Sequence, residues 1–147
     1  MGEAEKAEFL EEFEKERSHS LAAFCVMGGV FSEGIDLKEE RLIGVIVVGT
    51  GLPMVCVEQE VLKGYFDETE EKGFDFSYQY PGMNKVLQAA GRVIRTPEDR
   101  GVILLLDDRF LRRDHLELFP REWEHFQVVN RGNAARCLED FWNGREP

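Results

Sequence analysis

The chain has 147 residues, of which 43% are apolar and 32% charged, and its net charge at neutral pH is −11. This length fits one domain with a single hydrophobic core, and the composition excludes an intrinsically disordered chain. No apolar run approaches the roughly 18 residues that a membrane-spanning helix needs. The acidic start "MGEAEKAEFLEEFEKERSH" also lacks the basic beginning and apolar centre of a signal peptide. We therefore expect a soluble, cytoplasmic protein without a membrane partner.

Charge is distributed unevenly along the chain. Glutamates crowd residues 3–16, whereas arginines gather in one later stretch: Arg92, Arg95, Arg100, Arg109, Arg112 and Arg113. The acidic total argues against strong binding of a nucleic-acid backbone by the chain as a whole. The asymmetry still permits a local anion site on an acidic protein.

Three apolar runs predict buried strands, and a shorter run predicts a fourth. The three are "SLAAFCVMGG" (20–29), Leu42–Val48 and "GVILLLDDRF" (101–110), and the fourth is "HFQVVN" (125–130). Because these runs are continuous rather than alternating, they indicate a parallel sheet covered on both faces. Cys25 and Cys56 lie in such apolar surroundings, so we expect buried thiols there, and no cysteine or histidine cluster predicts a metal site.

Helical segments separate the apolar runs. The pattern of apolar and charged residues predicts helices over residues 3–17, 59–71, 82–95 and 133–142. Between the two middle helices, "EKGFDFSYQYPG" (71–82) predicts an aromatic loop interrupted by glycine and proline. The alternation of helices and strands predicts an α/β fold in one domain spanning residues 1–147.

Ligands of parallel α/β proteins collect beyond the carboxyl ends of the strands, and "GGVFSEGIDL" (28–37) directly follows the first predicted strand. Its glycines permit tight turns and close approach of a ligand to the backbone. Ser32, Glu33 and Asp36 supply short polar side chains. The same residues also suit an ordinary turn, so the segment alone leaves both interpretations open.

The second candidate segment is "QAAGRVIR" (88–95). At about 100° per residue, Met83, Leu87, Ala90 and Ile94 form one narrow stripe, the expected core face of the helix. A second stripe contains Gln88, Gly91, Arg92 and Arg95. Paired arginines at this spacing suit bidentate contact with phosphate oxygens. A solvated face is the alternative, although such a face does not need a glycine, which costs about 1 kcal/mol in mid-helix.

Together the two segments resemble motifs V and VI of superfamily 2 helicases. "SEGID" followed by "QAAGRVIRTPEDRGVILLLDDRF" is similar to the DinG/XPD family in particular, and "VIVVGTGLP" between them resembles a further segment of that family. The resemblance runs from Ala22 to Phe110 and more loosely to Trp142. It implies a RecA-like (P-loop NTPase-type) three-layer α/β domain with a mostly parallel sheet, namely the second, C-terminal motor lobe of an ATP-dependent DNA helicase.

The resemblance also implies roles for individual residues. Arg92 and Arg95 would be arginine fingers that approach the γ-phosphate of ATP, and Gln88 would help orient that phosphate or the attacking water. Glu33, Gly34 and Asp36 would couple the nucleotide to the DNA-binding surface, with Asp36 near the ribose, and Gly91 would provide clearance. Ser32 and the backbone amides around Gly29 would contact a phosphate of single-stranded DNA. Asp99 and residues 107–109 would hold the motif VI helix against the sheet.

ATP and Mg²⁺ would be bound mainly by a first lobe, the other partner that the resemblance implies. The chain contains no GxxxxGK[ST] phosphate-binding loop. A four-cysteine iron–sulfur cluster occurs in the first lobe of many family members, and no such cysteine motif is present here. We therefore expect a fragment of a longer protein that is inactive on its own. The alternatives are a non-catalytic protein- or nucleic-acid-interaction module derived from a helicase lobe, and a helicase-like translocase or nuclease component.

Overall fold

A computed structural model describes residues 3–16, 18–29, 42–94, 96 and 99–144. The chain divides into two compact units, Met1–Leu116 and Glu117–Pro147. The larger unit contains the sheet and every predicted site residue that the structure describes. Among the described residues, no helix combines the length and hydrophobicity needed to cross a bilayer.

The sheet of the larger unit has two parallel strands. Strand β1 (Gly44–Val48) pairs with β2 (Val102–Leu106), and the register places Gly44 opposite Val102 and Val48 opposite Leu106. Both strands come from the aliphatic runs that predicted them, and the parallel α/β fold class is confirmed. In β1, Val47 is buried, whereas Ile46 and Val48 are 61% and 74% exposed. The described residues therefore cover one face of β1 and leave the other open, unlike the expected sheet covered on both faces.

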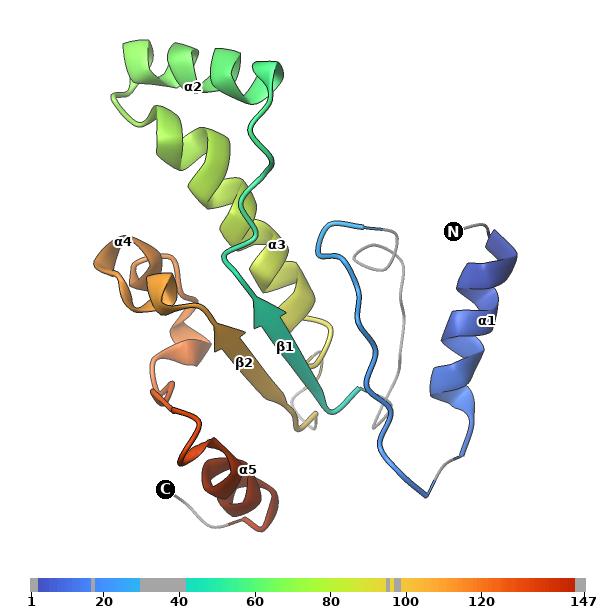
Figure 1. Ribbon diagram of the computed structural model, residues 1–147. Helices are drawn as coiled ribbons and strands as arrows, with labels where there is room; N and C mark the ends of the chain where they lie inside the picture. The colour runs from blue at the N-terminus through green and yellow to red at the C-terminus, as the bar shows by residue number, and fades with distance from the viewer. Residues whose placement is uncertain (1–2, 17, 30–41, 95, 97–98, 145–147) are drawn as a thin grey trace. The chain divides into compact units, whose positions relative to one another are not determined.

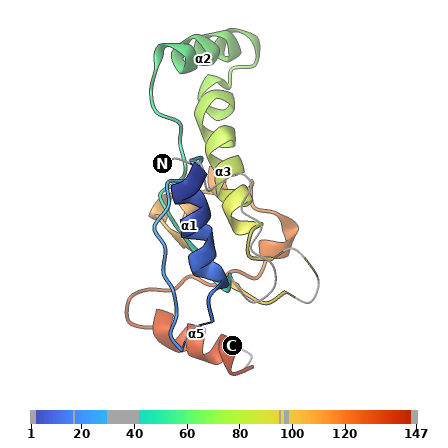
Figure 2. The ribbon, with the colours of Figure 1, turned by 90° about the vertical axis from the view of Figure 1, so that its right-hand side faces the viewer.

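Helical segments connect the two strands. Helix α2 (Val57–Thr69) is followed by a π-helical turn, η2 (Asp75–Gln79), which continues directly into α3 (Tyr80–Ala90). Figures 1 and 2 show α3 running beside β1, with α2 lying beyond the carboxyl end of that strand. The predicted helix 59–71 is thus confirmed with slightly different ends.

The predicted loop over residues 71–82 is wrong, because most of it is helical. Pro81 is the second residue of α3 and directly follows the π-helical turn η2, and such turns occur as local interruptions of α-helices. The aromatic rings contact one another at helical spacing: Phe74 stacks on Tyr78 at 5.5 Å, and Phe76 meets Tyr80 edge to face at 5.2 Å, centroid to centroid. Phe76 also stacks on Phe66 of α2 at 4.5 Å. Side-chain packing therefore prevails over the turn signals of glycine and proline.

The core of the larger unit gathers on one side of α3. Its buried apolar residues are Val47, Tyr78, Met83, Val86, Ala90, Val93 and Phe110. The expected stripe is correct at Met83 and Ala90 but wrong at Ile94, which is 42% exposed. The helix ends at Ala90, so Val93 and not Ile94 turns toward the sheet.

Two predicted strands are absent from the described chain. Residues 20–29 have no regular secondary structure, and Phe24 and Val26 there are 97% and 80% exposed. Cys25 is exposed as well, contrary to the expected buried thiol, and Cys56 is only partly buried. Residues 125–130 are likewise not a strand. An apolar run becomes a strand only when another backbone edge satisfies its N–H and C=O groups, and neither run is paired with a strand here.

The remaining elements are short or lie at the ends of the chain. Helix α1 (Glu3–Glu14) confirms the first predicted helix. After β2 come a 3₁₀ turn, η3 (Asp108–Leu111), and a single helical turn, α4 (Arg113–Leu116). The smaller unit contains the 3₁₀ turn η4 (Arg121–Trp123) and α5 (Ala134–Trp142), which confirms the last predicted helix. Whether residues 1–147 act as one domain stays a prediction.

Candidate functional site

Helix α3 ends before the arginines. Gly91 occupies the C-cap with φ −66° and ψ −3°. The next two N–H groups donate to carbonyls three residues back, Arg92 to Ala89 at 3.2 Å and Val93 to Ala90 at 3.0 Å. This tight turn terminates the helix, so Arg92 lies beyond the helical stripe that was predicted to carry it with Gln88, and Arg95 lies outside the described residues. Gln88 is exposed on the last turn of α3, and Arg92 is partly buried in the turn that follows.

The position of Gly91 at the end of α3 explains why a glycine is tolerated there. A glycine at a helix end does not carry the mid-helix penalty. A Cβ built on Gly91 would meet only the carbonyl oxygens of Leu87 at 3.3 Å and Gln88 at 3.9 Å, both from its own helix. The side facing away from α3 is open, so clearance for a ligand stays a prediction.

The turn after α3 lies at the amino edge of the sheet. A Cβ on Gly101 would overlap the Cγ1 methyl of Val93, so these two residues are packed together. Gly101 directly precedes β2, where the N–H of Val102 donates to the carbonyl of Ile43 at 3.0 Å. A helix that links two parallel strands begins near the carboxyl end of one and ends near the amino end of the next. Arg92 therefore follows a turn near the amino ends of the strands, whereas ligands of parallel α/β proteins collect beyond the carboxyl ends.

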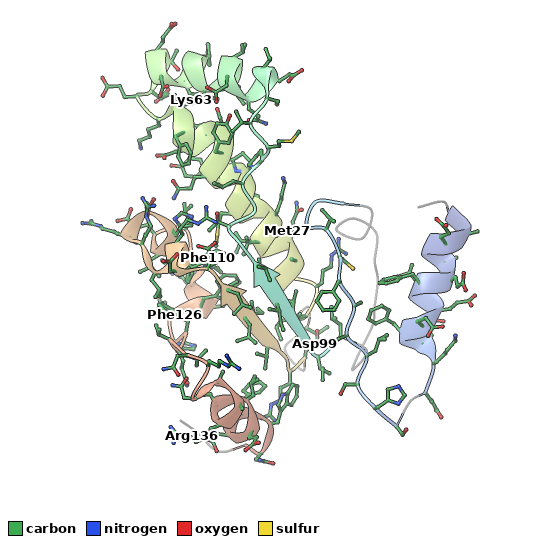
Figure 3. All side chains as sticks on the ribbon, in the orientation of Figure 1. Met27, Lys63, Asp99, Phe110, Phe126 and Arg136 are labelled. Atoms are coloured by element: carbon green, nitrogen blue, oxygen red, sulfur yellow. The ribbon has the colours of Figure 1, made fainter. Side chains whose placement is uncertain are left out.

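The Val26–Gly29 turn brings the beginning of motif V to α3. Gly28 has φ +79°, and a Cβ placed on it would be 3.3 Å from Cε and 3.6 Å from Nζ of Lys85. Met27 in the same turn reaches the loop after β1, with its Cε 3.3 Å from a Cβ built on Gly51 (Figure 3). The turn that leads into motif V thus contacts α3 at Lys85, three residues before the segment that begins at Gln88.

The predicted phosphate contact at Gly29 has a specific constraint. The Gly29 N–H already donates to the carbonyl of Val26 at 3.0 Å, which closes the turn. A phosphate at this position therefore needs another donor. Ser32, Glu33, Gly34, Asp36 and Arg95 lie outside the described residues, so their predicted roles stay predictions.

Lys85 is the residue that sequence reasoning missed. Its side chain is partly buried and lies across the Gly28 turn. No carboxylate among the described residues forms an ion pair with it, although the chain has 29 acidic residues. The available signal was its spacing, because Lys85 precedes Gln88 by three residues and so lies on the same helical face.

The acidic residues near β2 make local contacts. The Arg109 guanidinium donates to both carboxylate oxygens of Asp107, at 2.8 and 2.6 Å, and thereby lowers the pKa of Asp107 to about 2. Asp107 also accepts the backbone N–H of Arg109 and caps η3. Asp99 accepts the N–H of Thr96 at 2.7 Å. These contacts stabilise the ends of turns and do not show the expected attachment of α3 to the sheet.

The described residues can contribute to a phosphate site but do not build a nucleotide site alone. Lys85 and Gln88 supply a cation and an amide from α3, and Arg92 supplies a second cation from the turn that follows. Among the described residues, no group of three or more His, Cys, Asp or Glu side chains could hold a metal ion.

Comparison with known proteins decides the family. Residues 1–126 match the family described as "Helicase C-terminal domain". The chain belongs to the helicase C-terminal domains of the DinG/XPD family. This confirms the resemblance of its motifs V and VI and agrees with the parallel α/β structure.

Several relatives of this helicase C-terminal domain are DNA helicases by name. The chain is 33% identical over 128 residues to the "Regulator of telomere elongation helicase 1 homolog" of Caenorhabditis elegans, covering 81% of this chain and 13% of the relative. It is 33% identical over 121 residues to the "ATP-dependent DNA helicase YoaA" of Haemophilus influenzae, covering 80% and 18%. It is 34% identical over 136 residues to the "ATP-dependent DNA helicase CHL1" of Debaryomyces hansenii, covering 85% and 16%. The chain thus spans less than a fifth of the length of each of these three relatives.

Proposed function

We propose that this helicase C-terminal domain is the nucleotide-sensing second lobe of an ATP-dependent DNA helicase. The observation that carries the proposal is the meeting of the Val26–Gly29 turn with α3 beside Lys85, one turn before Gln88. The residues that lead into motif V thereby contact the helix that leads into motif VI. Nucleotide contacts and strand contacts can be coupled through such a shared element.

Arg92 and Arg95 act as arginine fingers in this proposal. They approach the γ-phosphate of an ATP held mainly by the first lobe and stabilise the charge that develops during phosphoryl transfer. Gln88 helps orient the phosphate or the attacking water. The turn that carries Arg92 supports such a role, because the packing of Val93 against Gly101 anchors it to the sheet. Because the backbone of this turn is held in place, Arg92 loses less conformational freedom when a ligand binds.

Contact with single-stranded DNA would come from the motif V side. Ser32 and the backbone around Gly29 would touch a phosphate, with Glu33, Gly34 and Asp36 linking that contact to the nucleotide. Lys85 adds a positive charge at the Gly28 turn and replaces the Gly29 N–H as a donor, since that N–H is already bonded to Val26. The net charge of −11 makes DNA binding by this lobe alone weak.

Catalysis requires the first lobe in this proposal. That lobe supplies the phosphate-binding loop and the acidic residues that hold Mg²⁺, and closure of the two lobes brings the arginines to the nucleotide. The isolated chain is therefore expected to hydrolyse no ATP. Robust turnover by the purified chain, abolished by Arg95→Ala, would overturn the requirement for a first lobe.

The decisive experiment measures ATP hydrolysis and ATP binding separately in the enzyme that contains this lobe. Arg92→Ala and Arg95→Ala are each expected to reduce hydrolysis by about 10³- to 10⁵-fold while retaining most ATP binding. Arg136→Ala is the matched control, since Arg136 is exposed on α5 in the smaller unit. Unchanged hydrolysis in either finger variant would remove that arginine from the proposal, and unchanged rates in both would favour the non-catalytic interaction module. Strand-displacement assays on the same enzyme distinguish a helicase from a translocase.

A further inference from the structure

Helix α2 turns its apolar stripe away from the rest of its unit. Val57, Val61 and Tyr65 recur every four residues and therefore lie on one face of the helix. They are 76%, 69% and 60% exposed, and α2 contains no buried residue. A surface helix ordinarily packs its apolar stripe against the core, whereas Val57, Val61 and Tyr65 of α2 are exposed.

Contacts on the opposite side hold α2 in this orientation. Glu60 accepts a 2.6 Å hydrogen bond from the Tyr78 hydroxyl, and Phe66 stacks on Phe76 at 4.5 Å. At the end of the helix, Asp67 accepts the backbone N–H of Gly73 at 2.9 Å and closes the connection to η2. These bonds join α2 to η2 at several points along its length, so the helix cannot roll to bury Val57, Val61 and Tyr65.

The apolar surface continues beyond the helix. Met54 and Val55, which precede α2, are 83% and 72% exposed. Gly64 lies on the outer face too, and a Cβ built there would have no atom within 4 Å. A glycine on an exposed face lets another backbone approach closely. Exposed apolar side chains that lie close together mark a protein-interaction site more often than isolated exposed residues do.

The charges around the stripe identify the kind of partner. At about 100° per residue, Glu68 falls within the arc of Val57 and Val61, and Glu58 falls beside Tyr65. Both glutamates are exposed. Lys63, the cation of this helix, is paired at 2.9 Å with Asp67. The outer face of α2 therefore combines apolar side chains with exposed carboxylates, which disfavours nucleic acid and favours cationic peptide.

We propose that the outer face of α2 docks a protein helix whose apolar stripe is flanked by lysine or arginine. The apolar stripe of the partner covers Val57, Val61 and Tyr65, and its cations lie near Glu58 and Glu68. This is the helix-against-helix mode of recognition, in which side chains at four-residue spacing supply the anchors. The site lies on a different helix from the proposed phosphate contacts, so it does not depend on the proposed function.

The test uses the 147-residue chain and a fluorescent amphipathic Leu/Lys peptide of about 18 residues, roughly 27 Å of helix. Fluorescence anisotropy measures affinity, and heteronuclear NMR identifies the residues whose signals shift. We expect binding with shifts centred on Val57, Val61 and Tyr65. Val61→Lys is expected to weaken binding by about tenfold. Val128→Lys is the matched control, because the exposed fractions of Val61 and Val128 are 69% and 65%, and it should retain wild-type affinity.

Two further peptides distinguish the contribution of the apolar stripe from that of the positive charge. A scrambled peptide of the same composition has no apolar stripe, and a Leu/Glu peptide has the stripe with the opposite charge. Both are expected to bind at least about tenfold more weakly than the Leu/Lys peptide. Equal binding of the scrambled peptide, equal loss in Val128→Lys, or shifts confined to other elements would overturn the proposal. Self-association of the chain that Val61→Lys abolishes, without peptide binding, would assign the face to a second copy and overturn it as well.

Discussion

Gly51 and Gly82 are in backbone contact: a Cβ on Gly51 would stand 2.7 Å from the carbonyl oxygen of Gly82. The contact is reciprocal, because a Cβ on Gly82 would stand 2.7 Å from the carbonyl oxygen of Thr50. The loop after β1 is thereby seated directly on the first turn of α3. Since backbone atoms on both sides cannot move away easily, this contact determines where α3 begins relative to the sheet.

Gly82→Ala is therefore expected to destabilise the fold by about 1–3 kcal/mol, the usual cost of overpacking. Denaturant unfolding of the chain, followed by circular dichroism, measures this change. Gly64→Ala is the matched control on α2, because its Cβ would meet nothing within 4 Å. That control should stabilise the helix by up to about 1 kcal/mol. Equal effects of the two substitutions would contradict the backbone contact.

Lys85→Gln is expected to remove one phosphate contact from DNA binding. Each neutralised phosphate of a single strand contributes about −0.7 to the slope of log affinity against log salt. The slope for an oligothymidylate, measured by anisotropy at several salt concentrations, should therefore become shallower by about 0.7 in this variant. A parallel titration with ATP distinguishes a strand phosphate from a nucleotide phosphate.

Lys63→Gln is the control for that experiment. Lys63 pairs with Asp67 at 2.9 Å on α2, away from the Gly28 turn. Its substitution should leave the salt slope unchanged. The same slope in wild type and Lys85→Gln, with binding retained, would exclude Lys85 from the DNA contact while leaving the arginine fingers untouched.

The Asp107–Arg109 pair predicts a loss of stability in acid. Arg109 lowers the pKa of Asp107 from 3.8 to about 2, so the contribution is complete above pH 3.8 and disappears as the pH falls toward 2. Asp107→Asn removes the ion pair but keeps an amide oxygen that can cap η3, for a total cost of about 1 kcal/mol at neutral pH. Thermal unfolding across this pH range should show wild type and variant converging in acid. Glu124→Gln, at an exposed site in the smaller unit, should not reproduce the effect.

The Tyr78–Glu60 hydrogen bond predicts a second pH dependence, in alkali. Glu60 raises the pKa of Tyr78 from 10.0 to about 12. Because the folded pKa is raised, the stabilisation is complete below pH 10 and is lost as the pH rises through 12. Ultraviolet titration of tyrosinate should show this late step in the folded chain, and Glu60→Gln should move it to lower pH. Persistence of the step in Tyr78→Phe would assign it to another residue, and Tyr65→Phe serves as the control.

Local patterns were sufficient to predict β1, β2, α2 and α5. Each has an apolar run or a helical repeat that needs only neighbouring residues to be recognised. The run at 20–29 has the same character, yet it is not a strand, because a strand also requires a backbone partner from elsewhere in the chain. The aromatic segment 74–80 shows the opposite case, since its rings contact one another at helical spacing and this packing prevails over the neighbouring glycine and proline.

The chemistry of the candidate site was readable in the sequence, but its geometry was not. Residue type and spacing selected Gln88, Gly91 and Arg92 as candidates, and the family comparison confirms the helicase family to which the resemblance pointed. The helix end at Ala90, the amino-edge position of Arg92 and the contact of Lys85 with Gly28 were not predictable. Each depends on a pairing between residues distant in sequence, such as Val93 with Gly101.

The sequence by itself determined the family, the α/β class and the residue types available for phosphate contact. Periodicity and motif spacing can be read from the amino-acid sequence, and they do not depend on how the segments pack. Only the tertiary structure decided that α3 ends at Ala90, that the Gly29 N–H is already hydrogen-bonded to Val26, and that the outer face of α2 is exposed. These outcomes depend on steric exclusion and hydrogen-bond competition between segments that meet only after folding.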